Sequence, residues 1–208
     1  MRTEIIIKIL TGAYLVIFFI YLFLPLIFMG AVAFNRSAIP QVKPWQGFTF
    51  IWFGELFTDQ QMWAALWNSL VVAFCVVLIA VPIGLGASLL LTRLRFKGRD
   101  GLYALLVSPI LTPGIILGIS TFLFWDRAFH VGGGLATAVV AQATFISGYC
   151  MLLIMARAQR FDRTLEDAAF DLGASHRQVF VKITLPFLRP ALISAAALAF
   201  MQSFENYN

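Results

Sequence analysis

The chain has 208 residues, of which 61% are hydrophobic and 12% are charged, and its formal net charge is +5. These proportions are far from those of an average soluble domain, and the apolar residues fall in long blocks that contain almost no charge. The composition therefore indicates a helical membrane protein. Membrane topology explains the positive charge better than nucleic-acid binding does, so we expect no nucleic-acid partner.

Five apolar blocks follow one another along the chain. A helix of about 24 residues rises about 36 Å, which is enough to cross a hydrocarbon core of about 30 Å. The blocks therefore predict an all-α polytopic membrane protein with one transmembrane domain, residues 1–208. The predicted spans cover residues 10–34, 64–91, 102–124, 135–156 and 191–208, and the fifth is still apolar where the sequence ends.

Prolines and small residues mark irregular points within these spans. Pro109 and Pro113 predict a kink near the start of the third span, because a proline leaves a backbone carbonyl without its usual partner. Gly84 and Ser88 lie four residues apart in the second span, a spacing that lets helix backbones approach closely. We expect this pair to serve helix packing, with lining of a translocation path as the alternative.

Lysine and arginine are distributed unevenly between the connections. Twelve of the fifteen lie before the first span, between the second and third spans, or after the fourth span. Positive residues concentrate in cytoplasmic loops, so we predict that the N-terminus and the loop of residues 157–190 are cytoplasmic. The three remaining residues, on the opposite side, are Arg36, Lys43 and Arg127.

The loop of residues 157–190 begins with the signals of a short, capped helix. The Thr164 hydroxyl is expected to accept the Asp167 N–H while the Asp167 carboxylate reaches back, as in a capping box. Glu166 and Asp167 then lie in the first turn, where acidic side chains interact favourably with the helix dipole. The sequence therefore predicts a helix from Thr164 to about Leu172.

A second short helix is predicted after a turn. Gly173 supplies a stop signal for the first helix, because glycine tolerates the left-handed conformation that commonly ends a helix. Ser175 and Gln178 have the spacing of a capping box, and we expect the helix that they open to end before Pro186.

The spacing of seven residues in this loop matches a known signature: Asp167, Ala168, Ala169, Gly173, Ile183, Leu185 and Pro186. It resembles the EAA signature of permease subunits of bacterial binding-protein-dependent ABC importers, which reads Glu-Ala-Ala, three residues, Gly, nine residues, Ile, one residue, Leu-Pro. Asp167 replaces the Glu and keeps its charge. The resemblance implies a bundle of the type I ABC importer permease kind in the bacterial cytoplasmic (inner) membrane.

The resemblance also implies partners and a site. The partners would be ABC ATPase subunits, a second permease subunit as a homo- or heterodimer, and a periplasmic or lipid-anchored solute-binding protein. The predicted helix of residues 164–172 would be the coupling helix, seated in a cleft of the ATPase. The implied ATPase-coupling residues are Glu166, Asp167, Ala168, Ala169, Leu172, Gly173, Ala174, Ile183, Leu185 and Pro186.

A narrower resemblance concerns the substrate. The stretch WQGFTFIWF at residues 45–53 resembles the external segment of the spermidine/putrescine permeases of the PotC type, and the likeness extends more weakly over nearly the whole chain. It implies a polyamine as solute, with an amino-acid derivative or an aminoalkyl phosphonate as alternatives. Because the family has a sixth span, we interpret the chain as C-terminally truncated.

One acid lies within the fifth apolar block. An ionisable group inside a span usually faces a cavity or a partner, and the PotC-type resemblance places an acid facing the pathway at this point. Glu205 and its neighbour Asn206 are therefore the candidate pathway residues. The alternative for Glu205 is an interhelical pair or a position at the membrane interface.

The sequence offers no motif for catalysis, metal binding or cofactor binding. It contains no GxxxxGK[ST] nucleotide loop, so ATP hydrolysis is expected in a separate subunit. Cys75 and Cys150 fall inside predicted spans and read as small apolar residues. His130 and His176 are predicted on opposite sides of the membrane and cannot share a metal. The alternative classes are a membrane enzyme and a non-transporting membrane assembly subunit.

Overall fold

The computed structural model describes residues 2–206, and the chain divides into two compact units, Met1–Trp63 and Ala64–Asn208. Within the described residues every regular element is helical, and one isolated antiparallel bridge joins Asn35 to Phe48. The all-α prediction is confirmed. Among the described residues, four helices are long and apolar enough to cross a membrane, and a bent helix pair is a fifth candidate span.

The first unit contains α1 (Arg2–Ala33) and α2 (Ile51–Thr58), joined by a segment organised around Asn35. The buried Asn35 side chain donates to the Gln41 carbonyl at 2.8 Å and accepts the Gln46 N–H at 2.9 Å. The rings of Phe34 and Phe48 stack with centroids 5.0 Å apart. These contacts order the segment although it has no regular secondary structure of its own.

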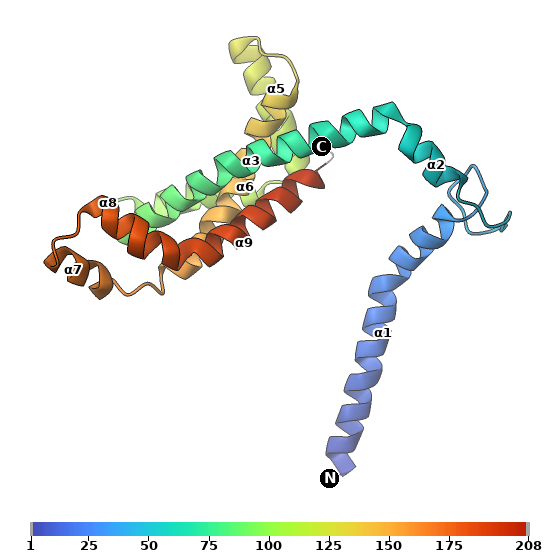
Figure 1. Cartoon of the computed structure of the whole chain (residues 1–208), viewed down its shortest axis with the longest axis horizontal. Coiled ribbons are helices and arrows are strands. Elements are labelled where there is room, and N and C mark those ends of the chain that lie inside the picture. Colours follow the sequence, from blue (N-terminus) through green and yellow to red (C-terminus); the bar gives the residue numbers. More distant parts are fainter. Residues whose placement is uncertain (1, 207–208) are drawn as a thin grey trace. The chain divides into compact units, whose positions relative to one another are not determined.

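Three long helices form the core of the second unit. They are α3 (Gln60–Arg93), α6 (Leu135–Ala158) and α9 (Leu185–Phe204), which lie side by side in Figure 1. The fully buried side chains between them are small or branched: Val76, Ala80, Ile146, Cys150, Ile154, Leu188, Ala195 and Ala199. Such residues allow helices to pack closely where no hydrophobic effect drives them together.

Gly84 lies at a close approach of α3 to α6. A Cβ added to Gly84 would stand 2.6 Å from the Cys150 Cβ and 2.8 Å from the Met151 backbone nitrogen. Ser88 is fully buried one turn further along α3. The packing role predicted for Gly84 and Ser88 is confirmed.

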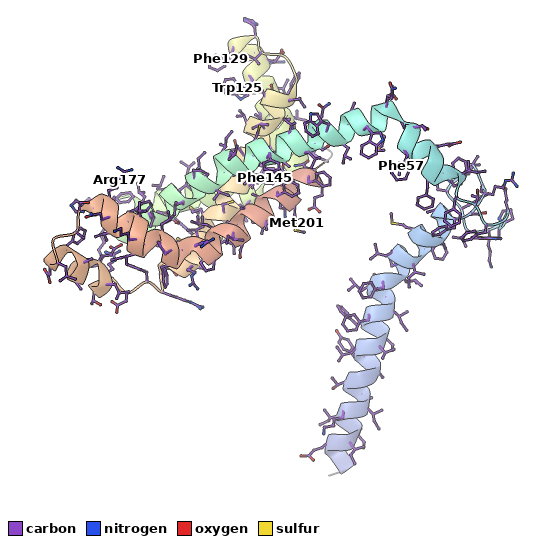
Figure 2. All side chains as sticks on the ribbon, in the orientation of Figure 1. Phe57, Trp125, Phe129, Phe145, Arg177 and Met201 are labelled. Carbon is purple, nitrogen blue, oxygen red and sulfur yellow. The ribbon has the colours of Figure 1, made fainter. Side chains whose placement is uncertain are left out.

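The third apolar block is broken rather than kinked. It forms α4 (Arg99–Val107), the 3₁₀ turn η1 (Ser108–Leu111) and α5 (Gly114–Phe129), with a bend of 106°. Thr112 and Pro113 between them have extended backbone angles, because a proline disfavours the helical conformation of the residue before it. Figure 2 labels Trp125 and Phe129 near the far end of α5. The irregularity predicted at Pro109 and Pro113 is therefore present, but the span predicted at residues 102–124 consists of separate helices rather than one kinked helix.

The polar loop also differs from its prediction. After α7 (Thr164–Asp171) come α8 (His176–Val179) and the π-helical turn η2 (Phe180–Thr184), which leads directly into α9. The helix that begins at His176 therefore continues through η2 and past Pro186, whereas the sequence predicted that it would end before this proline. Pro186 lies in the first turn of α9, directly after the π turn, where the regular α-helical hydrogen-bond pattern is already interrupted. The apolar helix runs over His176–Phe204, so it begins well before residue 191, where the fifth span was predicted to start.

Candidate functional site

The start of α7 is capped by a residue that precedes it. Asp162 Oδ1 accepts the Thr164 hydroxyl at 2.8 Å and the Thr164 N–H at 3.0 Å. These two bonds, the hydroxyl first, lower the pKa of the Asp162 carboxyl below its usual value. The predicted capping box between Thr164 and Asp167 is wrong, because an aspartate two residues before a free N–H forms the competing turn.

The end of α7 follows its prediction. Gly173 has φ +80°, its N–H donates to the Phe170 carbonyl, and the Ala174 N–H donates to the Ala169 carbonyl. This pair of bonds is the Schellman motif that ends helices at a left-handed residue. The capping box of Ser175 with Gln178 is also present. The turn between α7 and α8 is therefore rigid at both of its ends.

The α7–α8 surface presents apolar and acidic groups outward. Leu172 is 89% exposed, and Asp167 and Ala168 are exposed. Beside them lies a shallow cavity of about 440 Å³. It brings together five residues of the predicted coupling set, namely Ala169, Leu172, Gly173, Ala174 and Ile183, with Gln178, Val179 and Lys182. Leu185 and Pro186 lie in the first turn of α9 and do not line it.

Glu166 is buried, whereas its neighbour Asp167 is exposed. Glu166 is only 8% exposed, and its Oε1 accepts hydrogen bonds from Arg93 Nη2 at 2.5 Å and from the Thr184 hydroxyl. We call Arg93, Glu166 and Thr184 the Glu166 cluster. Sequence reasoning missed Arg93 and Thr184 because they lie far from Glu166 in the chain. The only available signal was an arginine at the last position of an apolar helix.

The candidate pathway residues are separated by the structure. Asn206 lines a cavity of about 460 Å³ whose walls are mainly α5 and α6 residues, including Phe145 (labelled in Figure 2). Glu205 does not line it: α9 ends at Phe204, and Glu205 is exposed at its C-cap rather than inside the helix. Its role in the pathway stays a prediction.

The polar wall of this cavity comes from a residue that the sequence did not single out. Gln142 is buried in α6, lines the cavity and accepts a hydrogen bond from the Ser203 hydroxyl of α9. Thr137 lines the same wall. Among the described residues, no group of three or more His, Cys, Asp or Glu side chains could hold a metal ion.

Comparison with known proteins identifies the family of the chain. Residues 80–207 match the family of binding-protein-dependent transport system inner membrane components, and the chain belongs to that family. It is a permease component of a binding-protein-dependent transport system.

Two relatives and one solved structure illustrate the likeness. The putrescine transport system permease protein PotI of Escherichia coli K12 is 35% identical over 194 residues, covering 90% of this chain and 68% of the relative. The spermidine/putrescine transport system permease protein PotC of Haemophilus influenzae is 28% identical over 197 residues, covering 95% and 76%. A crystal structure of a bacterial ABC transporter involved in alginate import gives a TM-score of 0.73 at 17% identity, covering 98% of this chain and 72% of that one.

Proposed function

We propose that this chain forms part of the membrane pathway of an ATP-driven importer for a polyamine. The observation that carries the proposal is the 35% identity to a putrescine permease over 90% of the chain. ATP would be hydrolysed by separate ATPase subunits. A second permease would complete the pathway, and a solute-binding protein would deliver the polyamine from outside.

Coupling to the ATPase is assigned to α7. A transmitting element must be stiff and must present a surface to its partner. The Asp162 cap, the Schellman turn at Gly173 and the Ser175 capping box make the α7–α8 segment stiff. Exposed Leu172 beside the 440 Å³ cavity, with Asp167 on the same helix, supplies the surface. ATP-driven closure of the ATPases would draw the two coupling helices together and open the pathway outward.

The solute pathway is assigned to the region around Asn206. The amide oxygens of Gln142 and Asn206 can accept hydrogen bonds from ammonium groups in the mainly apolar cavity. Glu205, exposed beside Asn206, would supply a negative charge in place of part of the hydration of a polyamine cation.

Reconstitution tests the proposal directly. The permease would be expressed with an ATPase, a second permease and a binding protein from the same organism, and the complex placed in proteoliposomes. We expect uptake of labelled putrescine that requires ATP and that excess spermidine suppresses. An aminoalkyl phosphonate and an amino-acid derivative serve as competitors of the alternative classes.

Three results would overturn the proposal. Competition by a phosphonate or an amino-acid derivative, without competition by spermidine, would reassign the solute. Uptake that is independent of ATP would exclude the ATPase coupling. A complex that assembles but takes up none of these solutes would favour a non-transporting assembly subunit.

A further inference from the structure

Two adjacent acids on α7 have opposite surroundings. Asp167 is exposed on the surface assigned to the ATPase, whereas Glu166 is buried against the rest of the permease. A buried carboxylate is unfavourable unless it is paired and hydrogen-bonded. The Glu166 side chain is therefore bound to partners inside the permease, whereas Asp167 is exposed.

The Glu166 cluster joins three helical elements. Arg93 is the last residue of α3, Glu166 is in the first turn of α7, and Thr184 is the last residue of η2. Arg93 Nη2 lies 2.5 Å from Glu166 Oε1 and 3.3 Å from Thr184 Oγ1, and the Thr184 hydroxyl also donates to Glu166. One carboxylate oxygen thus links the C-terminal end of α3 to the helix that continues as α9.

A second contact joins the start of α7 to the end of α3. The residue before α7, Arg163, donates from Nη2 to the Thr92 carbonyl at 2.6 Å. Cationic side chains near the C-terminus of a helix bind its unpaired carbonyls and interact favourably with its dipole. The N-terminal turn of α7 is therefore fixed to the end of α3 at two neighbouring points.

We propose that Arg93 is a positioning residue that holds the coupling helix α7 against α3 and η2 through Glu166 and Thr184. A movement imposed on α7 by the ATPase then passes to α3 and α9 together. Without the cluster, the connection between α6 and α7, residues 159–163, would absorb part of the movement. The inference rests on the proposed coupling role of α7, and it adds the route by which that helix engages the spans.

The decisive measurement is the number of solute molecules transported per ATP hydrolysed. In the reconstituted importer, Arg93→Gln should keep most of the ATPase activity and lower this ratio by about tenfold, within the range by which single residues alter coupling between sites. Arg95→Gln is the matched control, because Arg95 is exposed two residues further on. A defect of folding alone would lower the amount of complex but leave the ratio unchanged.

Rescue separates positioning from simple loss of charge. The double variant Arg93→Glu with Glu166→Arg restores the ion pair in reverse, and we expect it to recover the ratio at least in part. Thr184→Val keeps the shape of the side chain but removes the hydroxyl, and its effect should be smaller than that of Arg93→Gln.

A second readout needs neither ATP nor solute. Hydrogen exchange of the purified permease should show faster exchange of α7 amides in Arg93→Gln, with the middle of α3 unchanged. Unchanged α7 exchange, or an unchanged transport ratio in an importer that works, would overturn the positioning role. A wild-type importer that transports no polyamine would overturn only the proposed function, because the exchange experiment still tests Arg93.

Discussion

Single residues in the α7–α8 segment act mainly through backbone conformation and through the direction in which they face. Successive residues of a helix point about 100° apart, so Glu166 reaches the Arg93 side chain while Asp167 stays exposed. The predicted coupling set contains both acids, but in the structure Glu166 is buried and Asp167 is exposed. Gly173 acts through its backbone dihedral angle rather than through a side-chain contact.

Replacement of Gly173 should weaken the coupling surface. Its φ of +80° is costly for any residue with a Cβ, and no atom lies within 4 Å of the added Cβ, so the penalty comes from the backbone alone. We expect Gly173→Val to cost about 1–2 kcal/mol locally. Uptake should fall and the ATPase should dissociate on purification while the permease stays in the membrane at normal level.

The control for Gly173 is another uncrowded glycine. Gly101→Val also meets no atom within 4 Å, but Gly101 lies in α4 without a positive φ. This variant should retain the ATPase. If Gly173→Val also retains it and transports normally, α7 is not the coupling helix.

Glu205 offers a charge test of the pathway, to be made in a version of the permease that includes the remainder of its relatives' length. Glu205→Gln should leave assembly intact and impair uptake of spermidine more than uptake of a zwitterionic solute, because each additional positive charge loses a counter-charge. Asp100→Asn, an exposed acid of α4, is the control. Normal spermidine uptake by Glu205→Gln would remove Glu205 from the pathway.

At the scale of helices, backbone geometry decides where elements break and how close they come. Pro113 breaks the third apolar block because the residue before it must leave the helical conformation. Pro186 breaks nothing, because it follows a π turn and lies in the first turn of α9. The contact of α3 with α6 depends similarly on one missing Cβ, at Gly84.

Gly84→Ala should therefore destabilise the bundle. Its new Cβ would lie 2.8 Å from the backbone nitrogen of Met151, which cannot move without the helix. Overpacking of this kind costs about 1–3 kcal/mol. Thermal unfolding in detergent should show a lower midpoint for Gly84→Ala, whereas Gly86→Ala, in the same helix with nothing within 4 Å, should not lower it. Equal midpoints would exclude close packing at Gly84.

For the whole molecule, the distribution of charge predicts the orientation in the membrane. Single cysteines at positions 43 and 127 should react with an impermeant thiol reagent on intact cells, and cysteines at 95 and 160 should react only after lysis. The four native side chains are exposed, so burial in the chain should not mask them. Labelling of position 160 from outside would contradict both the orientation and the contact of α7 with a cytoplasmic ATPase.

The sequence by itself determined the helical membrane class, the apolar blocks, the stop at Gly173 and the cap at Ser175. These depend on composition and on interactions between residues close in the chain, which a local pattern can express. The Asp162 cap was also local, but a competing pattern at Thr164 concealed it.

Only the tertiary structure decided the 106° bend, the course of α8 into α9, the burial of Glu166 and the place of Gln142 in a cavity wall. Arg93 and Glu166 are 73 residues apart, and Gln142 and Ser203 are 61 apart. Such pairs form because packed helices bring their side chains together and a buried polar group must find a partner there. The spacing of residues within one segment of the sequence cannot predict such contacts between distant segments.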